Sequence, residues 1–192
     1  MTIFNEDTHT YTVDGVVLPS VTHICRFFMV DVAAGARTWL RDVAADRGSR
    51  VHAYTVAADY GETPEVIDPD CAGYVKAYER FLRDYTPQWQ YIEHVMGSRE
   101  LGYAGTADRI GIIDGKRVIL DIKTTSKLHK IAVTAQLQGY CKLAFEQDGF
   151  AAEKLCALLL DKGGTYRIYD LPFGGEFTLA LRMEQTLKGE RK

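Results

Sequence analysis

The chain of 192 residues lacks long apolar runs, closely spaced cysteines and any excess of basic residues. No stretch approaches the roughly 18 apolar residues that a membrane span needs, and the N-terminus lacks the basic and then apolar layout of a signal peptide. We therefore expect a cytoplasmic protein without membrane contact. The formal net charge of −3, taken alone, also argues against a nucleic-acid partner, because nucleic-acid-binding domains are often strongly basic.

The four cysteines stand far apart, at Cys25, Cys71, Cys141 and Cys156. Zinc and iron–sulfur sites usually contain cysteines a few residues apart, so neither kind of site is expected. A chain of this size without an export signal also has no need of disulfide bonds. We expect buried, reduced thiols.

The composition is that of a globular protein, with 46% hydrophobic and 26% charged residues, and the length fits a single domain over residues 1–192. Helical patterns cover about 21–29, 36–59, 70–85, 131–147 and 177–187, and strand patterns cover 90–96, 104–113, 117–123, 154–160 and 166–169. Residues 9–22 are typical of a hairpin that turns at Asp14–Gly15. This order predicts an α/β fold with a central mixed β-sheet flanked by α-helices.

The second hairpin signal, Asp114–Gly115, brings two acidic residues together. Asp108 and Asp121 each lie six residues from the nearer turn residue, so a two-residue turn places them nearly opposite each other. Side chains alternate along a strand, so Asp121 and Lys123 emerge on the same face. The sequence therefore predicts two carboxylates and one amine at the end of these strands.

Two facing carboxylates repel each other unless a cation lies between them, and Mg²⁺ or Mn²⁺ would meet that need. A metal ion there can polarise a phosphodiester and activate water. Lys123 would add positive charge near the phosphate, and the hydroxyl group of Thr124 would help to orient it. The alternative is a structural ion pair between Asp121 and Lys123 at an exposed strand end, which would contribute little to stability.

Two predicted helices carry further polar pairs. Gly48 and His52 are four residues apart, and a glycine inside a helix costs about 1 kcal/mol relative to alanine, which indicates a close approach of another group. His52 can ligate a metal, although a lone helical histidine is often only half-buried. Gln136 and Tyr140 also share a helix face, where they can contact a phosphate or a base, or simply pack.

Other charged residues leave two questions open. Glu93 can supply a further carboxylate from the strand before the meander, and Glu100 competes with it for that role. Basic residues near the candidate site are Lys116, Arg117, Lys127, His129 and Lys130, with Arg37, Arg41, Arg47 and Arg50 on the helix that bears His52. They are either solvated charges or a track for DNA phosphates, in which Lys127 is a candidate contact.

Together these residues resemble the motifs of the PD-(D/E)XK nuclease superfamily, and in particular its RecB-like exonuclease branch, which includes small phage-type nucleases. The likeness is carried, in the order of the family, by Gly48-x-x-x-His52, Gly105-Thr-Ala-Asp108, Asp121-Ile-Lys123 and Gln136-x-x-x-Tyr140. It extends over about residues 9–170, and the opening hairpin is also similar to that of phage members. Each motif is short, but the four in order are fairly specific.

The resemblance implies a restriction-endonuclease-like core and a DNA exonuclease that depends on Mg²⁺ or Mn²⁺, working in the cytoplasm of a bacterium or a phage-infected cell. It assigns metal ligation to His52, Asp108, Asp121 and the Ile122 carbonyl, catalysis to Asp108, Asp121 and Lys123, and DNA contacts to Gln136 and Tyr140. The branch with an iron–sulfur cluster has one upstream cysteine and a close downstream trio, a spacing absent here. The partner implied is DNA, with a single-strand annealing or recombination protein as a further candidate.

Two other functions stay open at this point. A structure-specific endonuclease would use the same residues, and a non-catalytic DNA-binding module would keep the fold without the chemistry. The presence of all three residues of this arrangement, Asp108, Asp121 and Lys123, favours an enzyme over a non-catalytic module. The net charge of −3 then no longer argues against a nucleic-acid partner, since a bound cation would offset part of the negative charge of the acidic residues. Oligomeric state and strand preference are not predicted.

Overall fold

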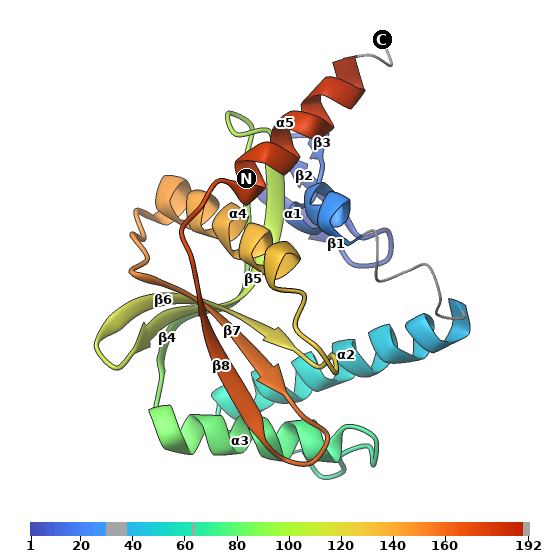
Figure 1. The fold of residues 1–192 in the computed structure, drawn as a ribbon, viewed down its shortest axis with the longest axis vertical. Helices are drawn as coiled ribbons and strands as arrows, with labels where there is room; N and C mark the ends of the chain where they lie inside the picture. Colours follow the sequence, from blue (N-terminus) through green and yellow to red (C-terminus); the bar gives the residue numbers. More distant parts are fainter. Residues whose placement is uncertain (30–37, 63, 190–192) are drawn as a thin grey trace.

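The structure is a computed structural model that describes residues 1–29, 38–62 and 64–189 (Figure 1). Its elements, in chain order, are β1 (Thr2–Asn5), β2 (Thr10–Val13), β3 (Val16–Leu18), α1 (Val21–Ile24), the 3₁₀-helix η1 (Cys25–Phe28), α2 (Thr38–Asp59), α3 (Ala72–Tyr85), β4 (Gln88–Ser98), β5 (Tyr103–Ile113), β6 (Lys116–Lys123), α4 (Lys130–Asp148), β7 (Lys154–Leu160), β8 (Tyr166–Leu171) and α5 (Glu176–Gly189).

The central sheet has five strands in the order β4-β5-β6-β7-β8. Strands β6 and β7 are parallel, and the other neighbouring pairs are antiparallel. Parallel neighbours need a long crossover connection, and α4 supplies it between β6 and β7. The predicted α/β class with a central mixed sheet flanked by helices is therefore confirmed.

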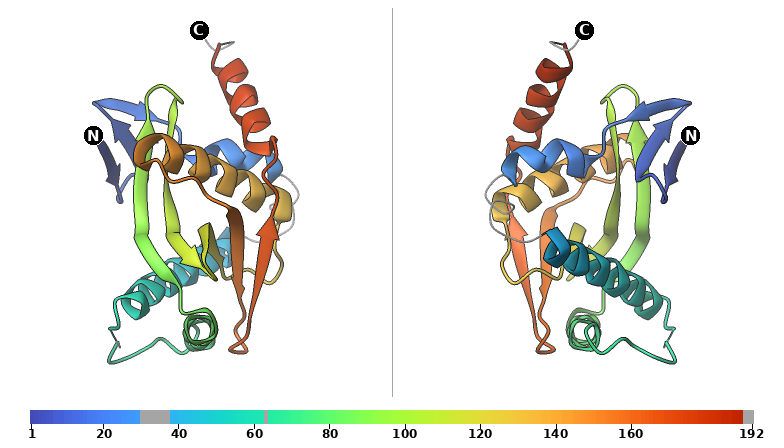
Figure 2. Two further views of the ribbon diagram at one scale, coloured as in Figure 1. Left: turned by 90° about the vertical axis from the view of Figure 1, so that its left-hand side faces the viewer. Right: turned by 90° about the vertical axis from the view of Figure 1, so that its right-hand side faces the viewer.

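Helices cover both faces of this sheet (Figures 1 and 2). One core lies between the sheet and α1, α4 and α5, and the other lies between the sheet and α2 and α3. The alternation along β6 divides its side chains as predicted, because Val118, Leu120 and Ile122 enter the second core whereas Ile119 enters the first. Both faces of β6 are thus sealed, and its polar C-terminal end is left to form the site.

Both Asp-Gly turns are where the sequence predicts them. Asp114 and Gly115 have φ angles of 49° and 71°, and Asp14 and Gly15 have φ angles of 46° and 79°. Two consecutive positive φ angles define the type I′ turn, whose twist matches that of the flanking strands. The turn between β5 and β6 therefore fixes the register of the strands that carry Asp108 and Asp121.

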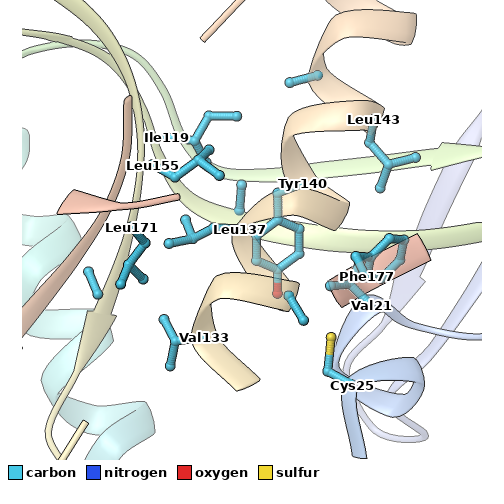
Figure 3. Packing of buried hydrophobic residues seen from close by; sticks show 14 of the residues in the cluster. Val21, Cys25, Ile119, Val133, Leu137, Tyr140, Leu143, Leu155, Leu171 and Phe177 are labelled. Carbon is cyan, nitrogen blue, oxygen red and sulfur yellow. The ribbon is translucent and has the colours of Figure 1, made fainter. Parts of the chain in front are cut away.

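Helix α4 is the central element of the first core (Figure 3). Its residues Val133, Leu137, Tyr140 and Leu143 pack against the sheet and against neighbouring helices, with Phe177 of α5 among their partners. A helix buried on so much of its surface needs few charges, and its side chains from Ala132 to Tyr140 are all buried. The helix holds the C-terminal half of the sheet in place behind the site.

The N-terminal segment differs in part from the prediction. The predicted hairpin is present as β2 and β3, but β1 adds a third strand that pairs with β2 and that the sequence reasoning missed. This small sheet lies beside β4 and β5 (Figure 2), where Tyr11 and Val13 pack on Ala104. The segment after it becomes helical at Val21, because the Ser20 side chain accepts a hydrogen bond from the His23 N–H and caps the helix.

The other boundaries agree with the predictions to within a few residues. The expected start of the long helix at residue 36 lies outside the described residues, and its end at Asp59 is observed. Strand β4 is longer than predicted, running from Gln88 to Ser98. Cys25, Cys71 and Cys156 are buried, Cys141 is half-buried, and all four are free thiols. No described helix combines the length and apolarity needed to cross a bilayer.

Candidate metal centre

The ends of β5 and β6 bring Asp108 and Asp121 together. The ladder between these strands runs as far as Arg109 opposite Leu120, and the next residue on each strand is one of the two aspartates. Instead of another backbone pair, the Ile122 N–H donates to Asp108 Oδ2 at 2.6 Å. Both carboxylates are nearly sealed from solvent, with exposures of 8% for Asp108 and 2% for Asp121.

Lys123 extends back over the same strand end. Its Nζ lies 2.6 Å from Asp121 Oδ2. Burial lowers the pKa of Lys123, but the carboxylates of Asp121 and Asp108 outweigh it and raise that pKa, so the amine is charged. Burial also raises the pKa of Asp121, and the charge of Lys123 only partly opposes this. The predicted convergence of two carboxylates and one amine is what the structure shows.

Helix α2 adds His52 to these groups. Its Nδ1 lies 3.6 Å from Glu93 Oε1 and 3.8 Å from Asp108 Oδ2, and its Nε2 lies 3.2 Å from the Ile122 carbonyl oxygen. Burial lowers the pKa of His52, but Asp108 and Glu93 more than compensate and raise it to about 9. In the metal-free protein, the proton on His52 Nδ1 therefore lies between the two carboxylates, at the position that a metal ion would occupy.

Glu93, and not Glu100, supplies the third acidic group. Ligand atoms of His52, Glu93 and Asp108 all lie within 4.8 Å of one another. Glu93 occupies the left-handed region with φ 49°, a conformation that costs a non-glycine residue about 1–3 kcal/mol. Glu100 lies in the turn between β4 and β5 and lines a different cavity. Sequence reasoning left these two residues undecided, because the backbone conformation of β4 determines which one turns inward.

A second buried charge cluster, which the sequence reasoning missed, lies next to this one. The Arg109 side chain is fully buried, with Nε 2.5 Å from Asp59 Oδ2, Nη1 3.0 Å from Glu93 Oε1 and Nη2 2.9 Å from Thr55 Oγ1. Asp59 accepts further hydrogen bonds from Tyr78 and Trp89. An arginine inside an apolar strand is the only sequence signal for such a cluster. The hydrogen bond from Arg109 holds one carboxylate oxygen of Glu93 in place.

The candidate metal ligands open into a cavity of about 800 Å³. Helix α2 lines one wall with Ala45, Gly48 and Ser49, and the N-terminal sheet lines another with Phe4 and Tyr11. The carboxylates of Glu93, Asp108 and Asp121 and the amine of Lys123 also line it. The cavity is thus a single space lined by His52 and by the three residues predicted to be catalytic, whereas Ile122 is not among its lining residues.

Gln136 and Tyr140 line the same cavity, but both are buried. Gln136 Nε2 donates to Thr22 Oγ1 at 3.2 Å, while its Oε1 has no hydrogen-bond partner among the described residues. The Tyr140 ring packs in the core (Figure 3) and fills the space beside Gly105, where a Cβ atom would lie 2.8 Å from Tyr140 Cε1. Part of their role is therefore structural, and their contact with DNA stays a prediction.

Thr124 and Lys127 lie on the loop between β6 and α4 and are not among the residues that line the cavity. The Oγ1 atom of Thr124 would be 3.6 Å from a Cβ at Gly48, so this loop runs beside α2. Lys127 is exposed, and its carbonyl oxygen accepts from Thr125. Both remain candidate contacts for a strand that leaves the cavity.

Several basic residues of the expected phosphate track are already paired. Arg50 binds Asp46, Asp68 and Asp70, so the second group of possible ligands, Asp68, Asp70 and Cys71, already has a cation. Lys116 and Arg117 pair with Glu153. Arg37 and the side chain of Arg41 lie outside the described part of the chain. For Arg50, Lys116 and Arg117, the structure favours solvated ion pairs over DNA contacts.

No protein-family model matches the chain, and the comparison with curated proteins finds no match either. Among solved structures, the chain is similar to the crystal structure of SSO0001, with a TM-score of 0.38 and 18% sequence identity. That match covers 84% of this chain and 82% of SSO0001. A likeness of this degree carries no conclusion about activity, which must rest on the site itself.

The residues of the site fit a hard divalent cation. Carboxylate oxygens, one imidazole and one backbone carbonyl are the donor types that Mg²⁺ and Mn²⁺ take in proteins. Asp121 Oδ2 is buried and accepts no hydrogen bond of good geometry from the described residues, although Lys123 lies close to it. Arg109 also pairs with Glu93, so the two neighbouring clusters together have four carboxylates and three positive charges, and one negative charge remains for a cation to balance.

Proposed function

We propose that this protein is a deoxyribonuclease that depends on Mg²⁺ or Mn²⁺, has a restriction-endonuclease-like core and degrades DNA from its ends. The observation that carries this proposal is the convergence of His52, Glu93, Asp108, Asp121 and Lys123 in one cavity. The order of the four sequence motifs adds to it. A purely structural cluster would pair every charge in a closed space, as Arg109 and Asp59 pair in the neighbouring cluster.

His52, Glu93 and Asp108 would hold the ion, with Asp121 and the Ile122 carbonyl beside them as further donors. A bound divalent ion supplies the Lewis acidity that polarises a phosphodiester and makes water a stronger nucleophile. Compared with the ligands implied by the family resemblance, this set adds Glu93. The left-handed backbone at Glu93 and its contact with Arg109 hold that carboxylate toward His52.

Lys123 is the group best placed to stabilise charge during hydrolysis. Water adds across a P–O bond, and negative charge builds up on the phosphate oxygens and on the leaving oxygen. The ammonium group of Lys123 lines the cavity and is held by Asp121, so it is oriented before the substrate arrives. Asp121 would thus position Lys123 and provide negative charge next to the metal ligands.

The test is a degradation assay on end-labelled linear DNA with Mg²⁺, with Mn²⁺ and with EDTA. We expect cleavage only with the metals, and about 100- to 1,000-fold slower cleavage by Lys123→Ala. Lys154→Ala is the matched control, because Lys154 also pairs with an aspartate but is far from the cavity. Equal rates for Lys123→Ala and wild type would refute the proposal.

Closed circular DNA separates the exonuclease from a structure-specific endonuclease, since an enzyme that needs an end leaves the circle intact. If the protein binds DNA but cleaves neither substrate with any metal, a non-catalytic DNA-binding module is the better description. The participation of a single-strand annealing or recombination protein is a separate question. It is tested by adding a purified annealing protein to the same assay and measuring the rate.

A further inference from the structure

The part of the cavity wall that the N-terminal sheet and the turn between β1 and β2 form is aromatic. The Phe4 ring packs against the Tyr11 ring in a tilted arrangement, with centroids 4.6 Å apart and an interplanar angle of 31°, and His9 meets the Phe4 ring edge-on at 5.9 Å and 88°. All three side chains line the cavity that contains the candidate metal ligands. A half-buried phenylalanine facing a polar cavity exposes an apolar surface that a flat ligand would cover.

This aromatic wall is rigidly connected to the candidate metal centre. The Tyr11 hydroxyl group lies 2.9 Å from Thr106 Oγ1, and Thr106 precedes Asp108 by two residues on the same strand. Tyr11 is itself buried among Val13 and Ala104. Phe4 therefore rests on a fixed support, and its distance from the carboxylates is set by β5 and not by a loose N-terminal segment.

By contrast, the part of the α2 wall around Gly48 is lined by small residues. Ala45, Gly48 and Ser49 face the cavity there, and a Cβ atom at Gly48 would meet only Thr124 Oγ1, at an ordinary contact distance of 3.6 Å, among the described residues. Packing within the described chain therefore does not require glycine at this position. The space above Gly48 belongs to the cavity and is available to a ligand.

We infer that Phe4, supported by Tyr11, is a stacking platform for one unpaired base, and that the cavity therefore selects single-stranded DNA or a frayed end. This inference rests on the proposed function. A base within a duplex has its faces covered by neighbouring bases, so only an unstacked base can present a face to Phe4. The acidic Glu6 at the same wall disfavours phosphates there, which directs the backbone toward Lys123.

The experiment measures binding apart from cleavage. Fluorescence anisotropy measures the dissociation constant in Ca²⁺, and a gel verifies that the DNA stays intact. The three labelled substrates are a 12-nucleotide single strand, the same strand with an abasic terminal nucleotide, and a blunt duplex. We expect wild type to bind the single strand about tenfold more tightly than the duplex or the abasic strand. In Phe4→Leu that preference disappears, whereas Phe4→Trp retains it.

The matched control is Ile3→Ala, since Ile3 is on the same strand but is exposed on the opposite side from Phe4. It should bind like the wild type. Equal sensitivity of wild type and Phe4→Leu to the abasic nucleotide would overturn the platform, even if DNA is cleaved. Binding in Ca²⁺ that depends on Phe4, together with no cleavage in the separate assay with Mg²⁺ and Mn²⁺, would instead support the platform and refute the nuclease.

Discussion

Two charged clusters lie side by side between α2 and the central sheet, and the face of α2 that bears His52, Thr55 and Asp59 contributes to both. Around Arg109 and Asp59 each charge has its counterpart, and the two side chains are sealed from solvent. Around Asp108 there are three carboxylates, a partly exposed lysine and a partly exposed histidine, open to a cavity. Glu93 belongs to both clusters.

The difference shows what each cluster is for. Because Arg109 and Asp59 pair with each other in a closed space, no ligand can bind between them. This pair therefore stabilises the fold, and Arg109 positions Glu93. An excess of acid beside a cavity reduces stability unless a cation arrives, and this is the condition of a binding site. Substitutions in the Arg109–Asp59 cluster should therefore reduce stability more than substitutions among the candidate metal ligands, which should instead affect metal binding.

The largest effect on stability is expected from Arg109→Met. It leaves Asp59 buried without its cation, which costs about 3–5 kcal/mol of unfolding free energy. Urea denaturation of the metal-free protein measures this. Asp108→Asn serves as the comparison and should change the free energy of unfolding by much less, because it removes one charge from an acidic excess. A similar loss in both variants would mean that the two clusters do not differ as described.

Metal-dependent stabilisation should belong to one cluster alone. Saturating Mn²⁺, at about 100 times its dissociation constant, is expected to add about 2.7 kcal/mol to the unfolding free energy of the wild type. Asp108→Asn should lose this gain, whereas Lys154→Ala should keep it. Thermal melts with and without Mn²⁺ provide the measurement. An undiminished gain in Asp108→Asn would place the ion elsewhere.

The pH dependence of the metal-free protein should reveal His52. Its pKa rises from 6.5 to about 9 on folding, so the protonated ring stabilises the fold fully below pH 6.5, and this contribution is lost as the pH rises through 9. We expect a decrease of about 1–2 kcal/mol over that range, since the ring is partly exposed and screened. Urea midpoints in EDTA at several pH values test this. In His52→Gln the decrease should be absent, and an identical profile would contradict the assignment.

The smallest effect, and one of opposite sign, is expected at Gly48. Gly48→Ala should raise the free energy of unfolding by about 1 kcal/mol, because alanine is the better helix former and the added methyl group meets no close neighbour in the described chain. The same methyl group intrudes on the cavity, so DNA cleavage should slow. Gly139→Ala is a useful contrast, since a Cβ there would lie 2.8 Å from Phe177 and should destabilise the fold.

The sequence was sufficient to predict the parts of the site that depend on local rules. The Asp-Gly turn determines the register of β5 and β6, and that register alone brings Asp108 opposite Asp121. Alternation along β6 likewise determines that Asp121 and Lys123 share a face. These predictions needed no knowledge of distant contacts, and the structure contains both arrangements.

The remaining parts depend on long-range packing. The choice of Glu93 over Glu100 follows from a left-handed residue inside β4, which no local pattern indicates. The partnership of Arg109 with Asp59 joins residues 50 positions apart. Tyr140 shares a helix face with Gln136 as predicted, yet its burial depends on Gly105 lying against the ring, which a helical pattern cannot show.

The most direct test of the central claim is a calorimetric titration of Mn²⁺ into the wild type and into Asp108→Asn at pH 7.5. The acidic cluster beside the cavity, as described, should give one saturable binding event in the wild type that is lost in the variant, while both proteins remain folded by circular dichroism. Absence of binding in the wild type, or equal binding in both proteins, would contradict the assignment of this cluster as a metal centre.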